Sequence, residues 1–482
     1  MGDATAPAKG KFGCFGVFRC LLPPATDPSP PIPANVVPNS APEKKLPASA
    51  PQARSELIKI QDACKAGDIA AVVAEMGAHR SISTVQEQGC VALWNLASKN
   101  DENTEAIARG GGIEAVVAGM GEHKSIAGVQ EQGCKALGNL AGEEENRTVI
   151  ARVGGIEAVV AGMEAHPSIL GVQEEGCAAL GNLALNDENR AAIVRAGGIA
   201  AVVAGIGKHR SCSGVQEKGC LVLVKLALLD ENKTAIARAG GIGAVVLGMA
   251  AHKSIAGVQA QGCVLLGNLA LDVENRTAIA RAGGIEAVVL AMGAHRPIAG
   301  MQEEGCWLLS SLSINDENRA AIARAGGILA VVAGMEAHPS IAEVQAWGCA
   351  ALRNLASMNE ENMAVIAGAG GIGAVVAGMG VHASVAGVQE SGCAALGNLA
   401  FNNDEHRTAI ATAGGIEAVV AGLGEHRAVV GVQQEGFLAL GNLALNDENK
   451  AAIARAGGVE AVVLGMGAHG LIAGVQEEGC AA

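Results

Sequence analysis

Residues 171–211 read GVQEEGCAALGNLALNDENRAAIVRAGGIAAVVAGIGKHRS, and this phrase recurs with small changes along nearly the whole chain of 482 residues. Its cysteine returns at intervals of 43 or 44 residues, at Cys90, Cys134, Cys177, Cys220, Cys263, Cys306, Cys349, Cys393 and Cys480, with Phe437 in its place once. A fixed period of this length indicates an array of supersecondary units, each packed on its neighbours.

Each unit divides into three predicted helices. Residues 187–196 begin with Asp187, a good N-cap, and end at Gly197-Gly198, which can supply the left-handed residue that closes a helix. A second apolar helix is predicted from Ile199 to about Lys208, and a third over 213–228. At the N-terminal end, we expect Ser55 to cap a longer amphipathic helix. No sustained alternation predicts strands, so the chain is expected to be all-α.

A short helix, a Gly-Gly corner and two longer helices ending in a GNLA-like phrase resemble the armadillo repeat. The resemblance covers residues 55–482 in about ten copies, and the last copy stops at GVQEEGCAA. It implies an all-α armadillo solenoid, a right-handed superhelix whose third helices line a concave groove. Residues 1–54 contain eleven of the fourteen prolines and are predicted to be a disordered leader.

Two local patterns suggest other proteins when they are considered alone. Gly368-x-Gly370-x-x-Gly373 resembles a dinucleotide-binding turn, and residues 362–389 carry no formal charge, as a membrane span would. In the sibling repeats, Arg281 and Glu286 stand where Gly368 and Gly373 stand here. We therefore interpret both patterns as sequence drift within one repeat.

Composition excludes further classes. The net charge is −14, and the chain beyond residue 54 carries −17, which argues against nucleic acid as a partner. Hydrophobic residues make up 50% of the chain but aromatic residues only 2%, which suits closely packed thin helices better than an enzyme pocket. We find no catalytic constellation and expect neither an enzyme nor a cofactor.

Two columns of residues resemble ligand sites without being expected to act as such. The histidine column is His79, His123, His166, His209, His252, His295, His338, His382, His426 and His469. Stacked helices lie about 8–10 Å apart, too far for one metal ion with bonds of about 2 Å, so we expect these imidazoles to cap their own helices. The same spacing exceeds the limit of about 7 Å for disulfides, so Gly-Cys pairs are predicted at tight helix crossings. His406, in place of the Asn of DENR, is the one histidine out of register.

In armadillo proteins of the importin-alpha type, an asparagine ladder holds an extended peptide and a tryptophan ladder receives its basic side chains. The matching asparagines here are Asn95, Asn139, Asn182, Asn268, Asn354, Asn398 and Asn442, with lapses at Lys225 and Ser311. The tryptophan positions read Val91, Lys135, Ala178, Leu221, Val264, Trp307, Ala350, Ala394 and Leu438. Only Trp307 matches, so recognition of nuclear-import signals is not expected.

This column nevertheless varies against a nearly uniform background, as partner-contacting positions would. A neighbouring column varies too: Trp94, Gly138, Gly181, Val224, Gly267, Ser310, Arg353, Gly397 and Gly441. One turn earlier are acidic residues at Glu87, Glu131, Glu174, Glu217, Glu303, Glu390 and Glu477. We expect a groove with acidic edges that binds a peptide of some basic character, through the asparagine ladder with Lys135, Leu221, Trp307, Arg353 and Leu438. Neutral drift on a solvated face is the alternative interpretation.

The leader offers a candidate anchor. Apolar residues lie among three basic ones over residues 9–22, with Cys14 and Cys20 available for acylation. Gly2 is a weaker candidate for myristoylation because Ala6 departs from the motif. This arrangement is similar to lipid-anchored vacuolar armadillo proteins. An organelle-targeting segment and a plain disordered tail are the alternatives. Thirteen cysteines without a disulfide pattern suit the cytoplasm or the nucleus.

The sequence thus predicts a non-enzymatic scaffold or adaptor that binds a protein or peptide partner in its groove. Peripheral membrane contact through residues 9–22 would add a tether. The first alternative is an assembly protein that self-associates through its C-terminal face. The second is an armadillo fragment of a larger multidomain protein.

Overall fold

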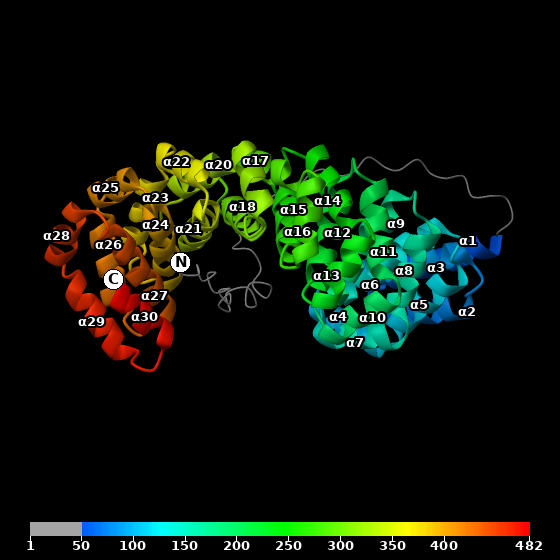
Figure 1. Ribbon diagram of the computed structural model, residues 1–482. Helices are drawn as coiled ribbons and strands as arrows, with labels where there is room; N and C mark the ends of the chain where they lie inside the picture. The colour runs from blue at the N-terminus through cyan, green and yellow to red at the C-terminus, as the bar shows by residue number, and fades with distance from the viewer. Residues whose placement is uncertain (1–50) are drawn as a thin grey trace. The chain divides into compact units, whose positions relative to one another are not determined.

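The computed structural model describes residues 51–482, with side chains from Arg54 onward. This part of the chain contains thirty helices and no strand (Figure 1). The predicted all-α solenoid of three-helix repeats is confirmed. The candidate lipidation sites Gly2, Cys14 and Cys20 lie outside the described residues.

Ten repeats follow one another, each with a first, a second and a third helix. The first helices are α1(Pro51–Ala66), α4(Asp101–Arg109), α7(Glu144–Arg152), α10(Asp187–Arg195), α13(Asp230–Arg238), α16(Val273–Arg281), α19(Asp316–Arg324), α22(Glu360–Gly368), α25(Asp404–Thr412) and α28(Asp447–Arg455). The second helices are α2(Ile69–Ala78), α5(Gly112–Glu122), α8(Gly155–Ala165), α11(Gly198–Lys208), α14(Gly241–Ala251), α17(Gly284–Ala294), α20(Gly327–Ala337), α23(Gly371–Val381), α26(Gly415–Glu425) and α29(Gly458–Ala468). The third helices are α3(Ser83–Ala97), α6(Ala127–Leu140), α9(Leu170–Leu183), α12(Ser213–Leu226), α15(Ala256–Leu269), α18(Ala299–Leu312), α21(Ala342–Ala356), α24(Ala386–Ala400), α27(Val430–Leu443) and α30(Ala473–Ala481).

Two predicted helix starts are wrong. The N-cap of α10 is Asn186, whose side chain accepts a hydrogen bond from the backbone N–H of Asn189, and Asp187 is the first helical residue. Asp187 still contributes its negative charge at the positive end of the helix. Helix α1 begins at Pro51, within the predicted leader, so Ser55 lies inside the helix and does not cap it.

The two glycines of each corner have different roles. Gly197 has φ 85°, in the left-handed region that side chains disfavour, and it lets the chain turn by 74° between α10 and α11. Gly198 begins α11, where an added Cβ would come within 2.5 Å of Ile193 Cγ2. The first glycine therefore permits the turn, and the second permits the close packing of helix on helix.

The Gly-Cys pairs mark a second close approach, as predicted. A Cβ on Gly176 would lie 2.6 Å from Cγ of Met163, which projects from the second helix of the same repeat. Cys177 beside it is fully buried. Small residues in the third helix thus let the second helix pack closely against it.

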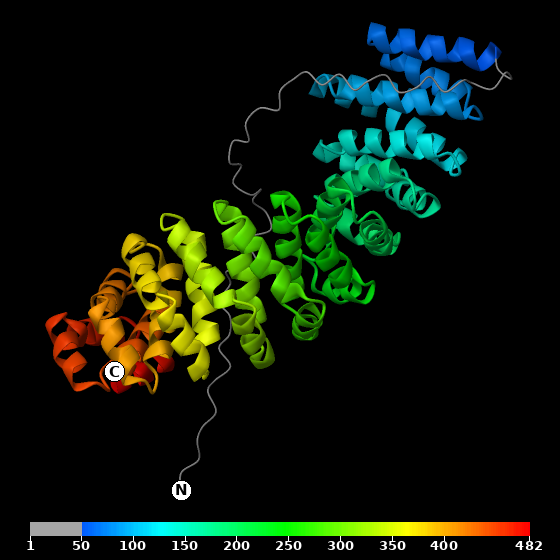
Figure 2. The ribbon, with the colours of Figure 1, turned by 90° about the horizontal axis from the view of Figure 1, so that it is seen from above.

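Packing continues from repeat to repeat. Each third helix packs against the third helix of the next repeat, from α3 to α30, and the second helices do the same from α2 to α29 (Figure 2). The buried Ile, Leu, Val, Cys and Met side chains form one continuous cluster. No repeat has a core of its own, so each is stabilised by its neighbours.

The uncharged segment near residue 370 belongs to this regular pattern. Gly370 is the left-handed corner between α22 and α23, at φ 83°. Over residues 51–482 no single helix is both long and apolar enough to cross a membrane. Six helix pairs, each bent by 69° to 74°, pass that test by length and composition alone.

Candidate partner-binding surface

The asparagine ladder connects neighbouring third helices. Asn182 Nδ2 donates to the backbone carbonyl of Gly138, one repeat earlier, at 2.8 Å. Equivalent bonds of 2.9 to 3.0 Å join Asn354 to Ser310, Asn398 to Arg353, and Asn442 to Gly397. Asn139 donates to Ser98 Oγ instead, Asn268 is buried, and Asn95 is half-buried. At Asn182, Asn354, Asn398 and Asn442 the side-chain amide N–H therefore bonds to the preceding repeat.

Lys225, which replaces the first missing asparagine of the ladder, makes the same contact with the preceding repeat. Lys225 Nζ donates to the carbonyl of Gly181 at 2.7 Å, as an asparagine would. Burial, reinforced by the charges of Arg147 and Arg190, lowers the pKa of Lys225 to about 8. At the second lapse, Ser311 Oγ donates to the carbonyl of Trp307 in its own helix, at 3.0 Å. The link between repeats thus survives at Lys225 and is replaced at Ser311.

Three predicted site residues present side chains on the third helices. Leu221 and Leu438 are each 37% exposed. Leu221 lies in a shallow depression of about 230 Å³ that Glu217, Lys218 and Gln261 also line. The ammonium group of Lys135 stands 3.8 Å from the ring centroid of Trp94, a cation–π arrangement.

Trp307 is buried, whereas a residue that lines a binding groove is expected to be exposed. Its side chain is only 6% exposed. The indole lies over Gly267 of the preceding repeat, where an added Cβ would overlap the ring, and its centroid is 6.3 Å from that of Trp347 in the next repeat. Trp307 therefore fills space between third helices and offers a partner little surface.

The acidic column lies at the starts of neighbouring third helices. Gly128 and Gly257 are in the first turns of α6 and α15, and a Cβ on either would come within 2.6 to 2.8 Å of the carboxylate of Glu87 or Glu217. Negative charge is favourable there because helix N-termini carry partial positive charge. Burial raises the pKa of Glu131 in this column, aided by repulsion from Glu175.

Arg353 forms an ion pair with a residue 82 positions further along the chain. Its Nη2 atom lies 2.8 Å from Oε1 of Glu435, although α21 and α27 are two repeats apart. Ala394 of the intervening α24 is buried to 2% exposure. Burial raises the pKa of Glu435, and the nearby Arg353 charge opposes that rise.

The histidine column does not cap its own helices through its side chains, so that expectation is wrong. His209 is the C-cap residue of α11, but its Nε2 atom is 2.9 Å from the carbonyl oxygen of Pro167 in the preceding repeat. The same contact, at 2.7 to 2.9 Å, occurs from His123 to His469. Because a carbonyl only accepts, Nε2 carries the proton and donates.

A glutamine column that our sequence reasoning missed caps the second helices instead. Gln216 is fully buried in α12, and its Nε2 atom donates to the carbonyls of Ile206 and His209 at 2.9 and 3.1 Å. Every repeat has this glutamine after the Val or Met of its GVQ-like phrase. An invariant polar residue on the apolar side of a helix was the available signal, because buried amides need partners.

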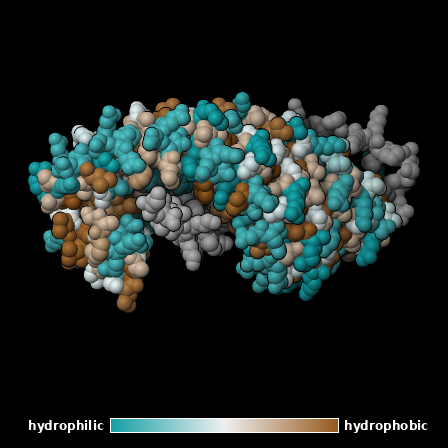
Figure 3. All heavy atoms as spheres, in the orientation of Figure 1, coloured by the Kyte–Doolittle hydropathy of each residue, from teal (hydrophilic) through white to brown (hydrophobic). Residues whose placement is uncertain are grey.

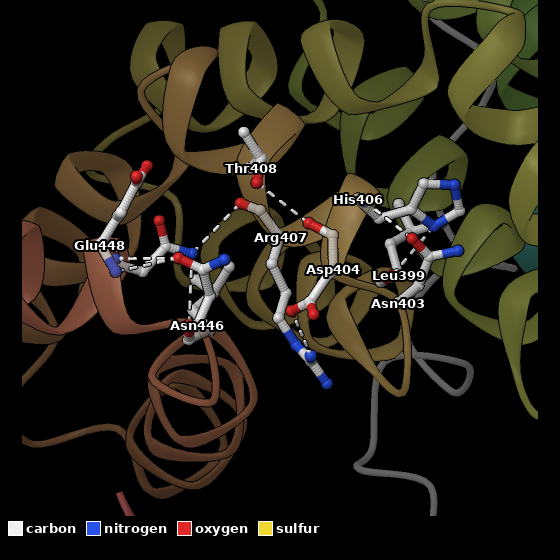
Figure 4. A network of polar contacts seen from close by, with 10 residues as sticks. Leu399, Asn403, Asp404, His406, Arg407, Thr408, Asn446 and Glu448 are labelled. Carbon is white, nitrogen blue, oxygen red and sulfur yellow. Dashed lines mark hydrogen bonds and ion pairs between the residues drawn. The ribbon is translucent and has the colours of Figure 1, made fainter.

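His406 keeps the contact of the asparagine that it replaces. Its Nδ1 atom lies 3.2 Å from the carbonyl oxygen of Leu399 (Figure 4). In the next repeat, Asn449 Nδ2 lies 3.2 Å from the carbonyl oxygen of Leu443. Beside it, Arg407 pairs with Asp404 at 2.8 Å. The change therefore preserves the cap on the preceding third helix.

Among the described residues, one group has metal-ligand donors close together. It comprises Glu56, Glu75 and His79 in the first repeat. Lys59 pairs with Glu56 at 2.5 Å and lies 3.7 Å from Glu75, so both carboxylates already face a cation. Among residues 51–482 no earlier repeat precedes His79, and its Nε2 atom lies 3.5 Å from both Glu56 and Glu75 instead.

Comparison with known proteins supports the fold. Neither the family models nor the curated proteins compared with the chain include a match. A solved structure described as an engineered protein is 30% identical and matches 86% of this chain and 98% of its own, with a TM-score of 0.71. The chain belongs to the same helical-repeat family as that protein. A structure titled for the interaction between cadherin and beta-catenin matches 88% of this chain and 83% of its own at 14% identity and a TM-score of 0.73, which shows a shared fold.

Proposed function

We propose that this chain is a non-enzymatic armadillo scaffold or adaptor that binds a peptide segment of a partner protein along its third helices. One observation carries the proposal: Leu221 and Leu438 expose apolar side chains at a position that varies between otherwise similar repeats. Apolar residues that anchor a partner are typically set among polar ones, and Leu221 lies beside Glu217 and Lys218. A structure titled for the interaction between cadherin and beta-catenin shares this fold, which supports a role in binding a protein partner.

A capture experiment with matched variants tests the proposal. The full chain would be used as bait in host lysate beside the double variant Leu221→Glu/Leu438→Glu. Leu290 and Leu329 are each 59% exposed on second helices, so Leu290→Glu/Leu329→Glu is the matched control. Trp307 is left unchanged because a charge at that buried site would disturb packing.

We expect partners of the unchanged chain to be retained by the second-helix variant and lost by the third-helix variant. Retention by both variants would contradict binding through the third helices. Loss by both would point to surface hydrophobicity rather than to a specific surface.

Self-association is a second candidate, favoured by the apolar surface of the last described repeat. Val459 and Val463 of α29 are 64% and 62% exposed, and Figure 3 shows apolar surface at this end of the array. Sedimentation velocity over a range of concentrations should then show a mass that rises with concentration. The rise should vanish in Val459→Lys/Val463→Lys and persist in Leu290→Lys. A constant monomer mass would exclude this role.

We further propose that the chain is cytoplasmic and is tethered to a membrane through residues 9–22. Its support is the sequence, in which Cys14 and Cys20 stand among basic and apolar residues. Metabolic labelling with a palmitate analogue should mark the full chain and fail to mark Cys14→Ser/Cys20→Ser. Equal distribution of both forms between membrane and soluble fractions would contradict a tether.

A further inference from the structure

The contact between Arg353 and Glu435 differs from the other ion pairs of the third helices. Lys218 and Glu174 also pair at 2.9 Å, but they join adjacent helices, α12 and α9. Arg353 and Glu435 are 82 residues apart and lie on either side of α24. The pair is thus a strap across a whole repeat.

The helix beneath the strap has small residues at both variable positions, Ala394 and Gly397. On one side, Asn398 of α24 bonds to the carbonyl of Arg353 at 2.9 Å. On the other, a Cβ on Gly397 would lie 3.4 Å from Cα of Ala439 in α27. Close packing on both sides of α24 lets a side chain of α21 reach a carboxylate of α27.

Repeat 3 provides an internal comparison. Its α9 carries the same small pair, Ala178 and Gly181, but the residue of α6 equivalent to Arg353 is Gly138. No equivalent side chain crosses α9, and Ala178 is half-buried where Ala394 is buried. The additional burial of Ala394 is consistent with cover by the strap.

Negative charge gathers around Glu435, the partner of the arginine. Glu390 of α24 and Glu478 of α30 both interact electrostatically with Glu435 and repel its charge. Arg353 is the attractive charge that acts on Glu435 in this group. Its guanidinium therefore occupies a place that favours a cation.

We propose that Arg353 occupies, within its own chain, a slot above Ala394 that accepts an arginine or lysine side chain of a bound partner segment. This inference rests on the proposed function and specifies the partner chemistry of repeats 7–10. The partner residue displaces Arg353 and pairs with Glu435. The strap is easily displaced because both side chains are partly exposed, and ion pairs of this kind hold weakly.

The test uses a defined probe rather than an unidentified partner. Fluorescently labelled acetyl-(Gly-Arg)4-amide would be titrated with the full chain and with Arg353→Met, which keeps the aliphatic stem over Ala394 but removes the competing charge. Arg353→Gln is a second form in case the first is unstable. Lys218→Met, which frees Glu174 in a pair between adjacent helices, is the matched control.

We expect Arg353→Met and Arg353→Gln to bind the probe about two- to fivefold more tightly, the range that loss of a partly exposed ion pair allows. Adding Glu435→Gln should abolish the gain, and acetyl-(Gly-Glu)4-amide should show none. Unchanged affinity in both arginine variants, an equal gain in Lys218→Met, or a gain that survives Glu435→Gln would overturn the proposal. The capture experiment with Leu221 and Leu438 does not depend on this result, so the two proposals can fail separately.

Discussion

Eight cysteines of the third helices are fully or almost fully buried, which decides their chemistry. Burial raises the pKa of each thiol, to about 12 at Cys90, Cys177 and Cys349. A thiol must ionise to react, so these residues should resist alkylation in the folded chain. Iodoacetamide at pH 8 followed by peptide mass spectrometry should find modification at Cys64, Cys212 or Cys480, which are not buried. Rapid modification of Cys177 before unfolding would contradict the packing described.

Lys225 gives the array a pH dependence of opposite sign to that of the thiols. Its folded pKa of about 8 is below the ordinary value of 10.5, so the unfolded chain binds more protons between these values. Its contribution to stability therefore rises as pH increases from about 8 to 10.5, whereas buried thiols lose stability above their ordinary pKa of 9.0.

The variant Lys225→Asn restores the ladder residue and should remove this dependence. We expect it to melt at a higher temperature than the unchanged chain at pH 7.5, with a smaller difference at pH 10. Comparing the two chains at each pH cancels the thiol contribution, which both share. A difference that is constant with pH would contradict the lysine assignment.

The effect of a Gly→Ala substitution on stability depends on where the glycine lies in its helix. Gly371 lies against Ile366, where an added Cβ would come within 2.5 Å of Cγ2, whereas Gly373 of the same helix has no atom within 4 Å of such a Cβ. Gly371→Ala should destabilise the chain by about 1–3 kcal/mol through overpacking. Gly373→Ala should stabilise it by about 0.5–1 kcal/mol because alanine favours helix. Thermal or urea unfolding of both variants checks the prediction, and the same sign for both would contradict it.

The helices could be predicted from sequence because their end signals are local. Gly-Gly pairs and the DENR phrase fixed most boundaries to within two residues, although the cap proved to be Asn186 rather than Asp187. Contacts between repeats could not be predicted in the same way. The burial of Trp307 depends on Gly267 in another repeat, and the histidine contact depends on where the preceding loop lies. Periodicity identifies equivalent residues but not which neighbour they touch.

Across the described array, stability should be lowest in the last repeat. Val459 of α29 is 64% exposed, whereas its counterpart Ile416 of α26 is 1% exposed because α29 packs against α26. A repeat with one neighbour has about half of the interfaces that stabilise an internal one. Hydrogen exchange measured by mass spectrometry should therefore be faster in α28–α30 than in α13–α15. Equal protection would mean that another surface covers α29.

The histidine and glutamine contacts imply that the number of repeats can change without loss of fit. Each glutamine bonds within its own repeat, and each histidine from His123 to His469 contacts only the repeat before it. A recombination event that removes or duplicates one whole unit therefore rejoins compatible surfaces. The strap is the exception, because loss of the repeat containing α24 would bring Arg353 and Glu435 into adjacent units and leave no helix beneath them. Duplication of one unit would therefore preserve the histidine and glutamine contacts, but between α21 and α27 it would separate Arg353 from Glu435 by a further repeat.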